Sequence, residues 1–435
     1  MKTRGHNAVY KNIYLVAANT IMLFVVVNLA LAVLFFAIDK VASVDQNSKT
    51  RRSAVREKGH LFDETGAPID NGNRIPYQMD WFDYTAYEGV VSQAYAGTVL
   101  DDFASLSKRG LTYQPWVQFS EPPYRGKLVN IDVDSHGLQK RRTENPKDTK
   151  SSILRIFTFG GSTTFGYNVS DEHTWPSYLS SILNKRAHVL GVDVGIEVTN
   201  YGHAFYYASQ EAILLTQLLK SAERPDLVIF MDGVNEYHAC ADAPQLTHKL
   251  KKAMHDLQFS STRSLTQKID WLPIARLAKT VNPGTPDQEP AKQEANDCEG
   301  IKTDRETGVD IAAQYRQNVE IERAISKVYG VTPLFFLQPD SSFNYPIELF
   351  RDSRLAKSTF ASWGFKKIFY SETRNIEGVV DLTALFKLWG PNRKAIVDDF
   401  HYSPLFDEFL AQRVADRVQL DEFLSHRTRV GFPNQ

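Results

Sequence analysis

Five short runs of mostly apolar residues follow one another from residue 151 onward, and they constrain the fold more than any other feature of the chain. They are residues 153–159, 194–200, 226–233, 331–339 and the weaker 378–382. Segments with the apolar period of helices lie between them, at 175–187, 209–223 and 310–330. Strands that are apolar on both faces and alternate with amphipathic helices predict a parallel sheet covered by helices on both sides.

A second feature is an uncharged stretch near the N-terminus, residues 12–38. About twenty apolar residues suffice to cross a bilayer as a helix, so this stretch is long enough with some tilt. A secretory signal has a shorter apolar core and a small-residue cleavage site, and Val41-Ala42-Ser43 matches such a site poorly. We therefore predict a tail over 1–12 and an uncleaved, single-pass signal anchor over 13–38.

The charges that flank this anchor give conflicting indications of its orientation in the membrane. The tail carries Lys2, Arg4 and Lys11, and more positive residues follow the anchor than precede it, which taken literally places the C-terminal side in the cytoplasm. However, the nearest of these is Lys40, which Asp39 offsets, and long C-terminal domains translocate largely regardless of charge. We expect the large C-terminal domain to be exported, on the periplasmic or extracellular face.

The remaining chain divides by composition. Residues 39–150 are predicted to form a polar stalk and then a small module of short strands and loops, since no helical period is visible after residue 76. The polar run 144–150 marks a boundary, and the main domain follows over 151–435. A polar insertion at about 239–308, with one helix near 246–258, interrupts that domain. Composition leaves open whether the insertion is a lid, a partner site or inert.

Charge and cysteine content exclude some functions. Lys plus Arg (50) nearly balances Asp plus Glu (51), so the chain has no general attraction to nucleic acid. Cys240 and Cys298 are not paired at zinc-ligand spacing, and no HExxH pair is present, so we expect no metal and no cofactor. The two cysteines form either a disulfide around the insertion or two free thiols.

Polar residues suited to acyl transfer follow the predicted strands. Ligands of an open parallel sheet bind beyond the carboxyl ends of its strands. Ser162 follows the first run after two glycines, Gly202 follows the second run, and Asn235 follows the third. Asp398 and His401 stand just before a last predicted helix, at 403–419. The sequence therefore predicts one site at the sheet edge that draws on all four segments.

Each of these residues suits one part of ester hydrolysis. A serine hydroxyl needs a base to remove its proton, and His401 is the candidate base for Ser162. Asp398, three residues before the histidine, can orient the ring and stabilise its charged form. The amide of Gly202 and the side chain of Asn235 are candidate donors to the oxyanion of the tetrahedral intermediate.

Together these segments resemble the SGNH (GDSL-like) hydrolase family over about residues 153–418. Ser162 lies in GGSTTFG, Gly202 in NYGHAF, Asn235 in GVNEY, and Asp398 and His401 in DDFH, in the order of the family. The resemblance implies a flavodoxin-like three-layer α/β/α sandwich and metal-free hydrolysis by a Ser-His-Asp triad. It also implies that Gly202 and Asn235 are the oxyanion donors.

Two positions depart from the pattern of the family. Gly161 stands where the GDS form has aspartate, as in GGST-type bacterial members, and Glu236 replaces an aspartate after Asn235. With these two departures, the resemblance does not define the subfamily or the substrate. Near the site, His203 and His238 either contact substrate or are satisfied loop residues, and Asp399 is an alternative partner of the histidine.

Other polar and aromatic residues admit two interpretations each. Asn19 and Asn28, within the apolar run, either bond to another helix or are tolerated singly. Trp116, Phe119 and Tyr124 are either packing residues of the small module or a sugar-binding platform.

The sequence thus supports two hypotheses. The first is a membrane-anchored serine esterase that acts on O-acyl groups of envelope carbohydrate or lipid, by hydrolysis or acetyl transfer. The second is a catalytically inactive scaffold of an envelope assembly that keeps the same fold. We favour the first because every catalytic position is filled.

Overall fold

The computed structural model describes two units of the chain, and each is considered by itself. One unit comprises Met1–Lys58 and His248–Asn296, and the other comprises Gly59–Thr247 and Asp297–Gln435. The described residues are 14–36, 84–87, 89–146, 150, 152–220, 224–236, 244, 247, 272–274, 277, 303–344, 364–390, 393–398 and 400–420. The predicted tail, the stalk, nearly all of the insertion with its helix, Cys240, Cys298, His238 and Asp399 lie outside them.

The second unit is built on one mostly parallel sheet with the strand order β10-β9-β8-β6-β7-β5-β4-β3. Numbered along the chain, its five parallel strands lie in the order 2-1-3-4-5, which is the flavodoxin-like arrangement that was predicted. These strands are β6 (Ser152–Gly160), β7 (Val194–Asn200), β8 (Leu227–Asp232), β9 (Thr332–Leu337) and β10 (Val379–Asp381). All five coincide with the predicted apolar runs.

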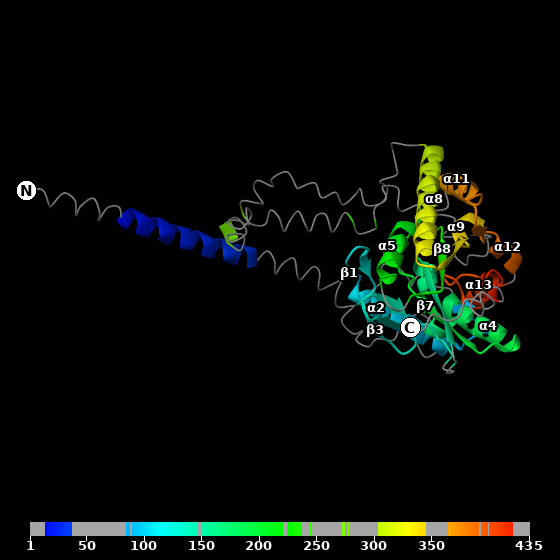
Figure 1. The fold of residues 1–435 in the computed structure, drawn as a ribbon. Coiled ribbons are helices and arrows are strands. Elements are labelled where there is room, and N and C mark those ends of the chain that lie inside the picture. Colours follow the sequence, from blue (N-terminus) through cyan, green and yellow to red (C-terminus); the bar gives the residue numbers. More distant parts are fainter. Residues whose placement is uncertain are drawn as a thin grey trace, which may run out of the picture. The chain divides into compact units, whose positions relative to one another are not determined.

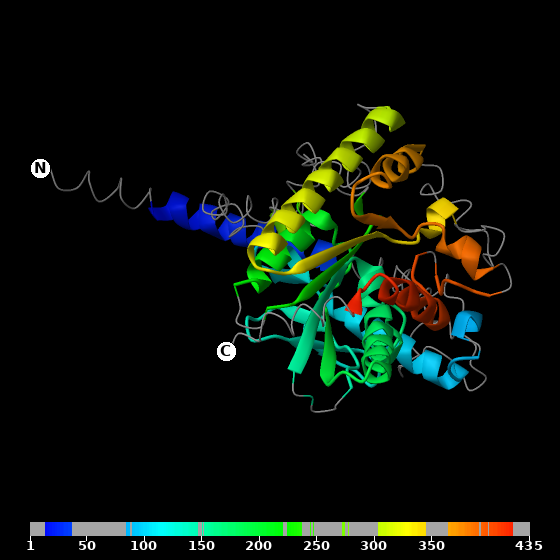
Figure 2. The ribbon, with the colours of Figure 1, turned by 45° about the vertical axis from the view of Figure 1, so that its right-hand side comes forward.

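Helices cover both faces of this sheet (Figures 1 and 2). One face packs against α5 (Ala208–Leu218), α8 (Asp304–Val328) and α11 (Gly364–Thr373). The other face packs against α4 (Trp175–Val189) and α13 (Pro404–Ala415), with the short α12 (Leu385–Trp389) beside them. The predicted three-layer sandwich is confirmed.

The centre of the sheet explains why its strands are mostly apolar. All six residues of β8 are buried, because helices cover the strand on both sides. On one face the rings of Phe159, Phe230 and Phe335 form a stacked row with centroid separations of 5.0 and 5.3 Å. This row holds β6, β8 and β9 in register below the edge where Ser162 and Asn235 follow.

The small N-terminal module continues the main sheet beyond β7. Its strands β3 (Tyr124–Arg125), β4 (Asn130–Val133) and β5 (Gln139–Arg141) pair antiparallel, and β5 joins β7 through Arg141 and Asn200. The hairpin of β1 (Thr112–Gln114) and β2 (Gln118–Ser120) forms a separate two-stranded sheet.

The prediction of strands and loops alone in this module was wrong. A 17-residue helix, α2 (Gln93–Arg109), follows the short 3-10 helix η1 (Tyr84–Tyr87). Ser92 caps α2 by accepting from the amide of Tyr95, and Val99, Phe103 and Leu106 recur at helical spacing on its buried face.

The aromatics of the module separate into two groups. Phe119 and Tyr124 are buried packing residues, whereas Trp116 is 75% exposed at the tip of the β1–β2 hairpin.

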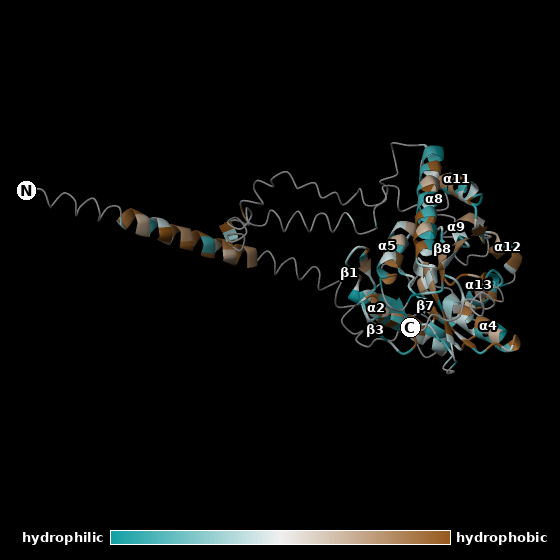
Figure 3. Ribbon diagram, in the orientation of Figure 1, coloured by the Kyte–Doolittle hydropathy of each residue, from teal (hydrophilic) through white to brown (hydrophobic). Residues whose placement is uncertain are grey.

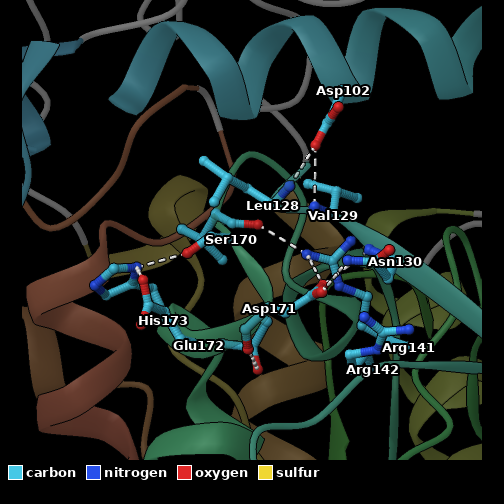
Figure 4. A network of polar contacts seen from close by, with 12 residues as sticks. Asp102, Leu128, Val129, Asn130, Arg141, Arg142, Ser170, Asp171, Glu172 and His173 are labelled. Atoms are coloured by element: carbon cyan, nitrogen blue, oxygen red, sulfur yellow. Dashed lines mark hydrogen bonds and ion pairs between the residues drawn. The ribbon is translucent and has the colours of Figure 1, made fainter. Parts of the chain in front are cut away.

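A polar network ties the module to the chain that follows β6 (Figure 4). The buried guanidinium of Arg141 pairs with Asp171 at 3.0 Å and donates to the carbonyl of Val169 at 2.9 Å. Asn130 donates to the same aspartate through both its backbone and its side chain, at 2.9 and 2.6 Å. Asp102 of α2 accepts from the amides of Leu128 and Val129, just before β4.

In the first unit, the helix Tyr14–Phe36 is long and apolar enough to cross a membrane, although a signal sequence meets the same criterion. Figure 3 shows the apolar character of this helix. Asn28 is satisfied within the chain, because its side chain donates to the carbonyl of Phe24 and accepts from the amide of Ile274 at 3.2 Å. Asn19 is exposed.

The Arg141–Asp171 pair gives a test of this packing. Because both side chains are almost fully buried, Arg141→Ala leaves an uncompensated carboxylate and is expected to lower the free energy of unfolding by about 3–5 kcal/mol. The double variant Arg141→Met/Asp171→Asn removes both charges and should recover much of that loss. Denaturant unfolding of the detergent-solubilised chain measures both. An equal loss in the single and double variants would contradict an electrostatic origin.

Candidate active site

The turn after β6 presents Ser162 at the edge of the sheet. Gly160 ends the strand with φ +150°, and a Cβ there would lie 2.1 Å from the hydroxyl of Thr164, so only glycine fits. Ser162 is the first residue of the short helix α3 (Ser162–Phe165), where amides have no acceptor within the helix. Its side chain is partly exposed, unlike its buried neighbours Gly161 and Thr163.

Asn235 meets this turn from the neighbouring strand. A Cβ on Gly161 would lie 2.1 Å from the side-chain nitrogen of Asn235, so the amide stands directly against the residue before Ser162. One N–H of this amide donates to the carbonyl of Tyr206 at 2.8 Å. Since β6 and β8 are adjacent and their connections run to opposite sides, this is the topological switch point, where such sheets bind ligands.

Gly202 packs against the back of α3. A Cβ on Gly202 would lie 2.5 Å from the amide nitrogen of Phe165, which explains why a glycine stands there. The side chain of Asn200 bridges the two segments: it donates to the carbonyl of Thr164 at 2.7 Å and accepts from the amide of Gly202 at 2.9 Å. The Gly202 amide therefore already has an acceptor. An oxyanion would be a second acceptor for the same N–H.

Asp398 and His401 form a hydrogen-bonded pair in a tight loop before α13. The Nδ1 atom of His401 lies 2.6 Å from Oδ2 of Asp398, and the other carboxylate oxygen accepts from the amides of Phe400 and His401 at 2.8 Å each. A bridge between Ile396 and Tyr402 closes the loop. Burial alone would raise the pKa of Asp398, but the charge of His401 and these hydrogen bonds lower it below its usual value.

Sequence reasoning missed two residues that join this loop to the turn after β6. Asn168 is fully buried and donates to Oδ2 of Asp398 at 2.6 Å. Its φ of +65° is a left-handed conformation that asparagine tolerates better than most residues. Tyr167 stacks on the ring of His401, with centroids 5.4 Å apart and planes at 25°. The motif GYN after α3 carries no recognised signature, so only the fold reveals these contacts.

The structure thus brings together all four predicted segments. Asn235 and Gly202 contact the turn that carries Ser162, and Asn168 and Tyr167 link the same segment to Asp398 and His401. The Nε2 atom of His401 is buried and has no hydrogen-bond partner. This is the atom that a general base would use.

The remaining candidates have structural partners or lie outside the described residues. His203 is buried, and its Nδ1 atom lies 2.7 Å from Glu121. Glu236 is buried and accepts from the amide of Ala208 at 3.0 Å. Within the described part of the chain, no group of three or more His, Cys, Asp or Glu residues could hold a metal ion.

Three buried carboxyl groups interact at the end of β8: those of Asp232, Glu211 and Glu322. Burial raises the pKa of Asp232 to about 7, although the hydroxyl of Tyr315, 3.5 Å from Oδ2, acts to lower it. Burial and the neighbouring charge of Asp232 raise the pKa values of Glu211 and Glu322 well above their usual range. Asp232 is therefore protonated in the folded state below about pH 7.

Comparison with known proteins identifies the class. The family model of the GDSL-like lipase/acylhydrolases matches residues 156–414, more than half of the chain. The chain therefore belongs to the GDSL-like lipase/acylhydrolase family, whose members are hydrolases that act on ester bonds. A search of curated proteins gives no match.

Solved structures that the chain matches include several esterases. The acetyl xylan esterase AlAXEase shares 11% identity, with coverage of 61% of this chain and 100% of its own and a TM-score of 0.30. The psychrotrophic esterase EstA from Pseudoalteromonas sp. shares 11% identity, with coverage of 62% and 98% and a TM-score of 0.31. The aryl esterase of M. smegmatis shares 15% identity, with coverage of 61% and 99% and a TM-score of 0.30. The family assignment rests on the family model.

The contact between Asn168 and Asp398 gives a prediction for activity. Asn168→Gly keeps the left-handed backbone but removes a hydrogen bond to a buried charge, a bond typically worth about 1.5–3 kcal/mol, and should lower kcat by about 10-fold or more. Asn168→Asp places a second carboxylate beside Asp398 and should lower activity further at pH 7. Steady-state turnover of a p-nitrophenyl ester measures both. Wild-type kcat in both variants would show that Asn168 does not support the pair.

The buried carboxyl groups predict that stability falls as pH rises. An unfolded aspartate loses its proton near pH ~4, whereas Asp232 retains it up to about 7, so rising pH between these values favours the unfolded state. The melting temperature should therefore fall from pH 5 to 8, and Asp232→Asn should flatten this fall. Asp416→Asn is the control, because Asp416 has a lowered pKa and stays ionised over this range. A wild-type slope in Asp232→Asn would contradict the assignment.

Proposed function

We propose that this protein is a serine esterase in which Ser162 is the nucleophile, His401 the general base and Asp398 its orienting carboxylate. The observation that carries the proposal is the pair of His401 and Asp398. The carboxylate holds Nδ1 at 2.6 Å, while Nε2 is buried without a partner. An imidazole held in this way has one free nitrogen with which to take a proton.

The reaction uses these groups in two steps. Oγ of Ser162 attacks the ester carbonyl carbon as His401 takes its proton at Nε2, and the ester C–O bond then breaks as the same proton passes to the leaving alcohol. Water attacks the acyl-serine in the same way and releases the carboxylic acid. Asp398 stays ionised throughout, because its pKa is lowered.

The oxyanion formed in both steps needs donors beside Ser162. Asn235 has a second side-chain N–H beyond the one bound to Tyr206, and it stands against Gly161. The amide of Ser162 is the first of α3 and has no acceptor within the helix. Gly202 contributes its amide by sharing it between Asn200 and the oxyanion.

The location and the substrate complete the proposal. The helix Tyr14–Phe36 anchors the protein in a membrane as a single span, and the hydrolase domain lies on the exported side. There it acts on O-acyl groups of envelope carbohydrate or lipid. Transfer of the acyl group to a sugar hydroxyl in place of water uses the same acyl-serine.

The test is ester turnover and covalent labelling of the full-length protein in detergent. Wild-type protein should hydrolyse a short-chain p-nitrophenyl ester and react with a fluorophosphonate probe at Ser162, and Ser162→Ala should lose both activities. Asn235→Ala should keep the nucleophile but lower kcat by about 10²–10³-fold, as for other oxyanion donors. Ser107→Ala, on α2, is the control serine. Unchanged turnover in Ser162→Ala would end the assignment, and an unreactive wild-type protein would favour the inactive scaffold.

A further inference from the structure

A buried glutamate of the N-terminal module touches two of the segments that form the proposed site. Glu121 follows β2, is 1% exposed, and precedes the family match, which begins at residue 156. Its Oε2 atom lies 2.7 Å from Nδ1 of His203, and its Oε1 atom accepts from the amide of Ala204 at 2.8 Å. The hydroxyl of Tyr167 approaches the same oxygen at 3.5 Å.

A carboxylate that is this deeply buried is costly unless it is hydrogen-bonded, so its three donors are fixed in turn by it. Each donor belongs to a segment of the proposed site. His203 and Ala204 directly follow Gly202, and the amide of His203 donates to the carbonyl of Gly160 at 3.0 Å, which ties the glutamate to the turn before Ser162.

The third donor connects Glu121 to the proposed base. The ring of Tyr167 stacks on His401, and its amide donates to the carbonyl of Ser162 at 3.1 Å. A shift of Tyr167 therefore moves both the support of the imidazole and the backbone of the nucleophile. Glu121 limits that shift from the hydroxyl end of the same ring.

The rest of the module holds the remainder of this segment in place. Arg141 of β5 donates to the carbonyl of Val169, and the amide of Asp171 donates to the carbonyl of Leu128 at 2.8 Å. Asn168 lies between Tyr167 and these contacts, in its left-handed conformation. The segment that supports His401 and Asp398 is thus fixed at both ends by residues outside the family match.

We propose that Glu121 is a positioning residue of the esterase site, and that the module over residues 93–141 is a part of that site rather than a spacer. This inference rests on the proposed function. Glu121 acts through His203, Ala204 and Tyr167, and it sets the geometry of the nucleophile turn and of the imidazole without contact to the reacting atoms.

Kinetics of three variants test the proposal. Glu121→Ala removes the acceptor of all three donors and should lower kcat by about 10–100-fold with little change in KM, because misplacement of catalytic groups acts on the chemical step. Glu121→Gln keeps the shape and one acceptor oxygen, and should recover part of the loss. Asp132→Ala is the matched control: it removes a carboxylate of the same module that pairs with Arg125 and Arg142, and kcat should stay within about twofold.

Three kinetic outcomes would overturn the proposal. The first is wild-type kcat in Glu121→Ala. The second is an equal loss of kcat and melting temperature in Glu121→Ala and Asp132→Ala, which would reduce the effect to stability of the module. The third is a rise of KM alone.

A readout without turnover keeps this test separate from that of the proposed function. Hydrogen exchange of Glu121→Ala should speed up in peptides covering 161–170 and 201–206, while peptides of β8 stay as protected as in the wild type. If the wild-type protein turns out not to hydrolyse esters, the proposed function fails, and this exchange pattern still shows whether Glu121 fixes these segments. Unchanged exchange in both peptides would refute the inference.

Discussion

A single buried carboxylate links the C-terminal loop of this protein to the turn that carries Ser162. Asp398 accepts from two backbone amides of its own loop, from the imidazole of His401 and from the side chain of Asn168, 230 residues earlier in the chain. A buried charge is tolerated only when it is bonded in this way. The arrangement of the proposed base relative to the nucleophile segment therefore depends on this carboxylate.

The sheet supplies the second constraint. The order 2-1-3-4-5 of the parallel strands places the ends of β6 and β8 side by side, with their connections leaving in opposite directions. The chain fills the resulting space with Gly160 and Gly161, which let Thr164 and Asn235 approach the backbone. An aspartate in place of Gly161 would direct its Cβ into the side-chain amide of Asn235, so this amide would have to shift.

The mostly apolar strands, and the positions of the candidate site residues after them, could be predicted from the sequence. Ser162, Gly202 and Asn235 directly follow such strands, and the alternation of strands and helices sets the order in which they meet. The helix α2 was missed because the aromatic, turn-rich residues after 110 dominated the interpretation of the module, although Ser92 and the spacing of Val99, Phe103 and Leu106 signal it.

Asn168 and Glu121 could not have been found in this way. Each acts across a contact between segments distant in sequence, 230 residues for Asn168 with Asp398 and 82 for Glu121 with His203, and neither belongs to a local motif. Such contacts follow from tertiary packing, which a single sequence does not specify. The side chain of Asn200, which accepts from the amide of Gly202, is a similar case, since it also donates to the carbonyl of Thr164, 36 residues away.

The central claim is that the imidazole of His401 serves the hydroxyl of Ser162. A crystal structure of the protein after reaction with a fluorophosphonate tests this most directly. The account predicts phosphorus bonded to Oγ of Ser162, with Nε2 of His401 within about 2.6–3.2 Å of Oγ or of a phosphonyl oxygen. An adduct on another residue, or an imidazole turned away from the modified serine while still bound to Asp398, would contradict it.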